Sequence, residues 1–273
     1  MSPDLSVIIL SYRTKNLVKE CVKSIRRAAP QLSYEIIVVD NASGDGVGEM
    51  MREQFPDIRF VESAENLGFA GGNNIGLREA LGRYRMVLNP DIVVLPGALE
   101  KMVAAMDAHP EIGLLGPKLL APDKSLQYSC YRFPSLLTPF LRRTRLGETR
   151  WGAGVVNRYL MADWDHAEMR DVDWLLGAAL IVRAEALAHV GLFDDRFFLY
   201  FEDTDWARRF WKAGYRVVYF PEAELFHFHR RESAEGSLLE SLLRRTTHVH
   251  VASAVKYFWK YREEDVPSRR VSA

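Results

Sequence analysis

The chain has 273 residues, and its 36 lysines and arginines balance its 36 aspartates and glutamates. This balance gives no reason to expect nucleic acid as a partner. Hydrophobic residues make up 48% of the chain, which excludes a disordered protein and allows a large core. Two cysteines are too few for a disulfide framework, so we expect a cytoplasmic protein. No apolar run approaches the ~20 residues of a membrane span, so any membrane contact is expected to be peripheral, at the inner face of the cell membrane.

The first half of the chain alternates between predicted strands and helices. Apolar runs predict strands over residues 5–11, 34–40, 58–62 and 84–89. Helical spacing predicts helices over residues 16–29, 46–55 and 71–81. Strand and helix in alternation predict an α/β fold with a doubly wound, mainly parallel sheet. Ligands of such sheets bind outside the carboxyl ends of the strands.

Polar residues lie at these predicted strand ends, and they are Ser11, Tyr12, Asp40, Asn41, Glu65, Asn66, Asn89 and Asp91. Together these polar groups line one edge of the predicted sheet, where a nucleotide could bind. Tyr12 could stack near a base, Asp40 could accept a hydrogen bond from a base or ribose, and Asp91 could ligate a divalent cation that holds a diphosphate. Each position alone has a plainer interpretation, because Asp40 also suits an ordinary turn and Asp91 can simply follow the end of a strand.

A glycine-rich segment over residues 66–76 follows the third predicted strand. Its glycines permit close approach of the backbone and leave free amides at a helix start, which suits a diphosphate. The segment does not match the G-x-G-x-x-G fingerprint, and no G-x-x-x-x-G-K-[ST] phosphate loop occurs, so a Rossmann dehydrogenase is disfavoured. A tight turn whose glycines serve helix packing is the alternative.

The most informative stretch is residues 197–206, which sets Glu202, Asp203 and Asp205 among aromatic residues. Burial beside aromatic rings raises the pKa of a carboxyl group, and neighbouring carboxylates raise one another's pKa. The cluster is therefore a candidate general base. The alternative is an ordinary helix start, in which Asp203 or Thr204 caps a helix that ends at Gly214.

Six segments, taken in order, resemble the family 2 glycosyltransferases, an inverting group with a GT-A-type fold, and most closely their rhamnosyltransferase-like branch. They are residues 7–12 (VIILSY), 38–43 (VVDNAS), 66–76 (NLGFAGGNNIG), 88–91 (LNPD), 174–178 (WLLGA) and 201–206 (FEDTDW). The resemblance implies one glycosyltransferase domain over residues 1–236, with a Rossmann-like nucleotide-sugar half (1–115) and an acceptor and catalytic half (116–236). A C-terminal amphipathic helix and tail would follow over residues 237–273.

The resemblance also implies roles for residues of this chain. The nucleotide sugar would lie against Ser11, Tyr12, Asp40, Asn66, Gly68, Gly72, Asn73, Asn89 and Asp91. Asp203 would be the general base, and Glu202 would orient the acceptor or hold the neighbouring loop. Asp205 is expected to pair with Arg208 or Arg209 on the same helix.

The metal signature of the family, Asp-x-Asp, is altered here because Asn89 occupies the position of its first aspartate. Asp91 then offers the carboxylate for Mg²⁺ or Mn²⁺. The resemblance favours His227 as a further ligand of the metal or the diphosphate, and a nitrogen ligand would tilt the preference toward Mn²⁺. Alternation along a predicted strand puts His229 on the same face as His227, and a solvent-facing pair of histidines is the alternative.

The branch favours dTDP-rhamnose as the donor, with UDP-hexoses next, and a glycan or polyprenyl-linked acceptor in cell-surface polysaccharide synthesis. On the acceptor side, Trp174 could offer a flat face to a sugar and Gly177 leaves room for it, although a buried core tryptophan is the alternative. Residues 128–171 show no clear periodicity, which predicts a flexible acceptor-side lid.

The C-terminal residues 238–261 have the spacing of a basic amphipathic helix. Such a helix could rest on an anionic membrane surface, cover the core or form a homodimer. Two rival functions stay open. One is an inactive sugar-nucleotide-binding relative, against which the retained Asp91, Glu202, Asp203 and His227 argue. The other is a nucleotidyltransferase that makes the activated sugar, although the chain has no basic glycine-rich N-terminal loop.

Overall fold

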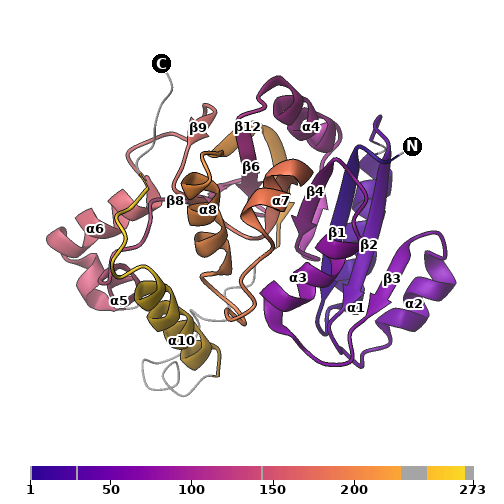
Figure 1. Cartoon of the computed structure of the whole chain (residues 1–273), viewed down its shortest axis with the longest axis horizontal. Coiled ribbons are helices and arrows are strands. Elements are labelled where there is room, and N and C mark those ends of the chain that lie inside the picture. Colours follow the sequence, from indigo (N-terminus) through magenta and orange to yellow (C-terminus); the bar gives the residue numbers. More distant parts are fainter. Residues whose placement is uncertain (1, 29, 143, 229–244, 268–273) are drawn as a thin grey trace.

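The computed structural model describes residues 2–28, 30–142, 144–228 and 245–267. Within them, a ten-stranded sheet has the order β3-β2-β1-β4-β11-β6-β12-β5, with β7 paired to β6 and β9 to β12 (Figure 1). Its strands are β1 (Leu5–Ser11), β2 (Tyr34–Asp40), β3 (Arg59–Glu62), β4 (Tyr84–Leu88), β5 (Ile92–Val94), β6 (Ile112–Leu120), β7 (Leu126–Gln127), β9 (Arg170–Asp171), β11 (Ala179–Arg183) and β12 (Arg216–His227). A separate pair consists of β8 (Cys130–Tyr131) and β10 (Trp174–Leu175).

The helices that cover the sheet come from both halves of the chain. They are α1 (Lys15–Ala28), α2 (Val47–Gln54), α3 (Gly68–Glu79), α4 (Ala98–Ala108), α5 (Thr138–Leu141), the 3-10 helix η1 (Arg145–Glu148), α6 (Arg150–Leu160), α7 (Ala184–Val190), α8 (Glu202–Lys212) and α10 (Arg245–Lys260). Along β1 the side chains alternate between two faces. Val7 and Ile9 pack with α1, α2 and α4, while Ile8 packs with α3, α7 and α8.

The mainly parallel sheet is confirmed. β1 pairs in parallel with β2 and β4, and β2 pairs in parallel with β3. β11 runs antiparallel between β4 and β6, and β12 runs parallel to β6. The carboxyl ends of β1, β2, β4 and β12 therefore lie at one edge of the sheet, where ligands of such folds bind.

Helix α3 begins at Gly68, three residues before the predicted start, so its glycines lie inside the helix. They allow α3 to approach the sheet closely. A Cβ atom at Gly72 would lie 2.5 Å from Cδ1 of Leu10, and one at Gly76 would lie 2.3 Å from Cγ2 of Ile8. Packing, the alternative that the sequence left open, explains these two glycines.

Residues 128–171 contain regular structure despite their lack of periodicity, because the described part of the segment forms β8, α5, η1, α6 and β9. Their role as a flexible acceptor-side lid stays a prediction. Tyr131 stacks on Trp174 with ring centroids 4.5 Å apart, and on Tyr159 at 5.2 Å. The aromatic residues that obscured the periodicity are therefore the local core of this segment.

The C-terminal helix α10 begins at Arg245, and the predicted helical residues 238–244 lie outside the described residues. Tyr257, in α10, and Tyr261, directly after its end, are buried against Phe197 and Phe201, which precede α8. Figure 1 shows α10 below α5 and α6. One face of α10 thus covers part of the core. Among the described residues, no helix is both long enough and apolar enough to span a bilayer.

Candidate functional site

Hydrogen bonds join the six sequence segments into one region at the carboxyl edge of the sheet. The bonds are Asn41 N–H to Ser11 O (2.8 Å), Asn41 Nδ2 to Gly68 O (3.0 Å), Phe69 N–H to Phe198 O (2.7 Å), Asn89 N–H to Ala178 O (2.8 Å) and Gly177 N–H to Asp203 Oδ2 (3.0 Å). Residues that are far apart in the sequence therefore build a single site.

The predicted nucleotide residues of β1 and β2 differ in exposure. Ser11 is buried, and its hydroxyl lies 3.3 Å from that of Thr14. Tyr12 is 42% exposed, so its ring is accessible for stacking on a base. The Asp40 carboxylate accepts the backbone N–H of Ser43 at 3.2 Å, which forms the turn that the sequence offered as an alternative. This turn also fixes the direction of the Asp40 carboxylate at the edge.

A pair of asparagines holds the loop that enters α3. Asn41 donates to Oδ1 of Asn66 at 2.9 Å and accepts the backbone N–H of Leu67 at 2.9 Å. Oδ1 of Asn66 also accepts the N–H of Gly68. Asn41 was not among the site residues inferred from the sequence, although its place after Asp40 marked it as polar. The contact of Asn66 with a nucleotide stays a prediction, since its side-chain oxygen already serves the loop.

Gly68 lies against the segment that precedes the acidic cluster, and Asn73 lies further along the same helix. Gly68 has a φ of 73°, and a Cβ there would lie 2.1 Å from the carbonyl oxygen of Phe198, so the position requires glycine. Nδ2 of Asn73 donates to the Phe69 carbonyl at 2.9 Å. Its buried Oδ1 has no hydrogen-bond partner among the described residues, so this acceptor remains for a ligand.

The acidic cluster begins helix α8 after two residues in the left-handed region, Tyr200 (φ 69°) and Phe201 (φ 68°). Such conformations cost about 1–3 kcal/mol each and gather at functional sites. Phe201 occupies the N-cap position without a side-chain hydrogen bond, so the alternative in which Asp203 or Thr204 caps the helix is wrong. Asp203 instead accepts the N–H of Gly177 on Oδ2 and that of Thr204 on Oδ1, at 3.0 and 2.7 Å.

Burial raises the pKa values of the two neighbouring carboxyl groups, Asp203 and Glu202, to different extents. Burial raises the pKa of Asp203 to about 6, although the N–H groups of Gly177 and Thr204 favour its ionised form. Burial, with the charge of Asp203, raises the pKa of Glu202 well above its usual range. The N–H groups of Gly177 and Thr204 thus favour the ionised form of Asp203, whereas burial beside that charge favours the protonated form of Glu202. This arrangement suits Asp203 for the role of a general base.

Asp205 faces the C-terminal helix and not the site. It accepts Nε of Arg209 at 2.9 Å, which confirms the expected pairing, and it also accepts the Tyr261 hydroxyl at 2.7 Å and the ammonium group of Lys260. Arg208 donates to backbone carbonyls just after α10 instead. Asp205 thus anchors the helix that carries Asp203.

On the acceptor side, the prediction that Trp174 presents a face to a sugar is wrong. Its side chain is buried in the stack with Tyr131, and its Nε1 donates to the carbonyl of Arg132 at 2.9 Å. Gly177 does lie beside Asp203, because a Cβ there would be 3.5 Å from Oδ2 of Asp203 and 3.3 Å from the ring of Phe69.

Sequence reasoning missed Tyr159, which lies in α6. Burial raises its pKa, the Asp203 charge adds to this rise, and the nearby Arg142 opposes it. Nη1 of Arg142 donates to the Tyr159 hydroxyl at 3.4 Å. No local signal identified it, because its stack on Tyr131 depends on the tertiary packing of α6 against β8.

Asp91 and His227 meet at the same edge because β5 and β12 pair with His227 opposite Ile92. Nε2 of His227 lies 3.4 Å from Oδ2 of Asp91, and its Nδ1 lies 2.8 Å from Oε1 of Gln127. The contact of Nδ1 with Gln127 orients the imidazole ring so that Nε2 lies toward Asp91. Oδ1 of Asp91 is buried without a hydrogen-bond partner in the described part of the chain. These groups fit a divalent cation, although no cluster of three or more candidate ligands occurs among the described residues, and His229 lies outside them.

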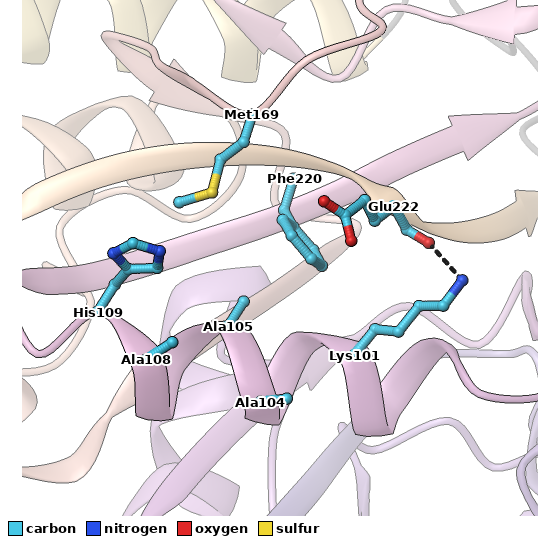
Figure 2. A pocket seen from close by; sticks show the side chains of 8 residues that line it. All are labelled: Lys101, Ala104, Ala105, Ala108, His109, Met169, Phe220 and Glu222. Atoms are coloured by element: carbon cyan, nitrogen blue, oxygen red, sulfur yellow. Dashed lines mark hydrogen bonds between the residues drawn. The ribbon is translucent and has the colours of Figure 1, made fainter.

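A surface hollow of about 310 Å³ lies elsewhere, between α4 and β12 (Figure 2). Small side chains of α4, including Ala104, Ala105 and Ala108, leave this space, and Lys101 closes one end by donating to the carbonyl of Glu222 at 3.0 Å. None of its lining residues belongs to the edge described above. We therefore place the candidate site at the edge and not in this hollow.

Comparison with known proteins connects this site to a family. Residues 6–158 match the family model described as glycosyl transferase family 2, and residues 86–262 match the one described as glycosyl transferase family group 2. The chain is 29% identical to an N-acetylglucosaminyl-diphospho-decaprenol L-rhamnosyltransferase of Mycobacterium tuberculosis, across 95% of this chain and 88% of the relative. It is 24% identical to the rhamnosyltransferase WbbL of Escherichia coli, across 94% and 93%.

Two solved structures share the fold. GalNAc-T7 with UDP, GalNAc and Mn²⁺ superposes with a TM-score of 0.66 at 15% identity, covering 96% of this chain and 49% of that one. The mannosyltransferase PcManGT from Pyrobaculum calidifontis, in complex with GDP-Man and Mn²⁺, superposes with a TM-score of 0.58 at 18% identity, covering 97% and 76%. The likeness confirms the expected GT-A-type fold.

Proposed function

Because this chain belongs to glycosyltransferase family 2, we propose that it is an inverting enzyme that moves a deoxyhexose or hexose from a nucleoside-diphosphate sugar to a hydroxyl group. Two relatives are named as rhamnosyltransferases, which supports rhamnose as the sugar. The name of the mycobacterial relative includes a diphospho-decaprenol, which supports a polyprenyl-linked acceptor in cell-surface glycan synthesis.

The observation that carries this proposal is the setting of Asp203. Its buried carboxylate accepts the Gly177 N–H at 3.0 Å and the Thr204 N–H at 2.7 Å, and burial raises its pKa to about 6. In the reaction, the acceptor oxygen bonds to the anomeric carbon as its proton passes to Asp203, and the bond from that carbon to the diphosphate breaks. Attack from the side opposite the leaving group inverts the configuration.

The donor would lie along the strand edge. Tyr12 offers its exposed ring to the base, Asp40 its carboxylate to the base or ribose, and Asn73 its buried Oδ1 to the sugar or diphosphate. Asp91 and His227 would hold Mg²⁺ or Mn²⁺, which when bound neutralises charge on the leaving diphosphate. Two fold neighbours were solved with Mn²⁺ and a UDP or GDP species, which supports a metal-dependent nucleotide site.

A thermal-shift panel tests the donor class. We expect dTDP or UDP to raise the melting temperature, and the rise to grow with Mn²⁺ or Mg²⁺, because ligands that bind only the native state stabilise it. GDP and NAD serve as comparison ligands. A response to NAD alone, or no response to any pair of metal and nucleotide, would contradict the proposal. Release of pyrophosphate from a nucleoside triphosphate would instead indicate a nucleotidyltransferase.

A further inference from the structure

The segment that contains α5, η1 and α6 exposes an unusual number of large apolar side chains. We call its outer face the α5–α6 surface and define it by Leu136, Leu137, Phe140, Leu146 and Trp151. Leu136 is 74% exposed and Trp151 is 61% exposed. Single exposed apolar residues need no explanation, but a group within one compact helical unit marks an interaction surface.

The charge of the same segment is strongly positive. Residues 132–160 contain six arginines and one acidic residue, Glu148, whereas the whole chain has a net charge of zero. The side chains of Arg145, Arg150 and Arg158 make no hydrogen bond, ion pair or ring contact within the described residues. Their guanidinium groups therefore have no partner that holds the fold, and they belong to the same helices, η1 and α6, as the exposed Leu146 and Trp151.

The α10 helix, which the sequence suggested as the membrane contact, uses its cations internally. Lys260 binds Asp194 and Asp205, and Lys256 donates to the carbonyl of Arg196 at 2.7 Å. These cations of α10 are thus engaged within the fold, although the helix also exposes Val251, Val255 and Trp259. The arginines of the α5–α6 surface have no such internal task.

This surface also connects to the proposed base. Arg142 follows α5, and it reaches the Tyr159 hydroxyl of α6, whose pKa responds to the charge of Asp203. Tyr159 in turn stacks on Tyr131, which packs on Trp174, three residues before Gly177. The aromatic stack thus links the α5–α6 surface to the segment in which Gly177 donates its N–H to Asp203.

We infer that the α5–α6 surface docks the enzyme on an anionic lipid bilayer, with the exposed leucine and aromatic side chains in the interfacial layer and Arg145, Arg150 and Arg158 against lipid phosphates. This inference rests on the proposed function, because docking there would bring a lipid-linked acceptor to Asp203. Apolar insertion combined with several arginines is the chemistry that selects an anionic membrane over a neutral one.

Vesicle co-sedimentation tests the inference without any substrate. The wild-type chain should bind vesicles of phosphatidylcholine mixed with phosphatidylglycerol, bind phosphatidylcholine alone at least ~10-fold more weakly, and dissociate at high salt. The double variant Arg145→Gln/Arg150→Gln and the single variant Trp151→Ser should each weaken binding to the mixed vesicles, by at least ~10-fold for the double variant.

A matched variant on α10, Val255→Ser/Trp259→Ser, removes exposed apolar groups of similar size and should keep the binding. Equal binding to both vesicle types, or loss of binding in the α10 variant alone, would overturn the inference. So would a wild-type dimer that ignores vesicles and becomes monomeric in the α5–α6 variants. The metal-dependent shift with dTDP or UDP should be unchanged in these variants, so failure of membrane docking is distinguishable from failure of the proposed function.

Discussion

The Tyr261 hydroxyl donates a 2.7 Å hydrogen bond to Oδ1 of Asp205, which lies 56 residues earlier in the chain. Asp205 is fully buried on α8, two residues after Asp203. The bond therefore ties the C-terminal helix to the helix that carries the proposed base. Because Lys260 and Arg209 bind the same carboxylate, Asp205 is the centre of a buried, charged network.

Replacing Tyr261 with Phe should lower the free energy of unfolding by about 1–2 kcal/mol, because a buried carboxylate loses one donor. Urea unfolding measures this change. Tyr215→Phe is the control, since the Tyr215 hydroxyl contacts His189 at an exposed site. Equal effects of the two substitutions would show that Tyr261 contributes no more than a surface hydroxyl.

Alanine substitutions separate the packing glycines from the others. Gly76→Ala places a Cβ 2.3 Å from Ile8 and should cost at least ~1 kcal/mol of stability, because β1 and α3 must move apart. Gly154→Ala, in α6, meets nothing within 4 Å and should be neutral or stabilise by up to about 1 kcal/mol. Thermal unfolding measures the melting temperatures of both variants. Similar melting temperatures would refute the packing role of Gly76.

The pH dependence of kcat/KM should show an acidic limb near pH 6. Asp203 acts as a base only when ionised, and burial raises its pKa to about 6, so activity falls as protons bind below that pH. Glu202→Gln should leave this limb in place, because the limb is assigned to Asp203, and burial with the charge of Asp203 raises the pKa of Glu202 well above its usual range. A limb that disappears in Glu202→Gln would assign the titration to Glu202 instead.

Loss of either proposed metal ligand should remove the metal-dependent part of nucleotide binding. We expect Asp91→Asn and His227→Gln each to raise, at least ~10-fold, the Mn²⁺ concentration that is needed for the metal-dependent stabilisation by dTDP or UDP. The stabilisation without added metal should change little. His109→Gln, at the hollow beside α4, is the control. A full metal response in both ligand variants would exclude this pair.

Much of the sheet was predictable because its strands are continuous apolar runs with polar ends. The same pattern located Asp40 and Asp91 at the edge, and the aromatic setting located Asp203. The burial of Trp174 was not predictable, since it depends on a stack with Tyr131, 43 positions earlier. Local periodicity carries no information about such pairings.

The sequence of the glycine-rich segment also could not distinguish two roles for its glycines. Gly68 and Gly72 suit diphosphate contacts, and they also suit packing positions. Only the structure shows that Leu10 and Phe198 fill the space beside them. Tyr159 likewise has no local motif, and its stack on Tyr131 follows from the tertiary packing of α6.

The most direct test of the account is sugar transfer by Asp203→Asn, which keeps the size of the side chain and removes its basicity. With a dTDP- or UDP-linked sugar and a lipid-linked acceptor, we predict that release of nucleoside diphosphate falls at least ~100-fold while the thermal shift with nucleotide and metal is preserved. Transfer at the wild-type rate in this variant would contradict the assignment of Asp203 as the base.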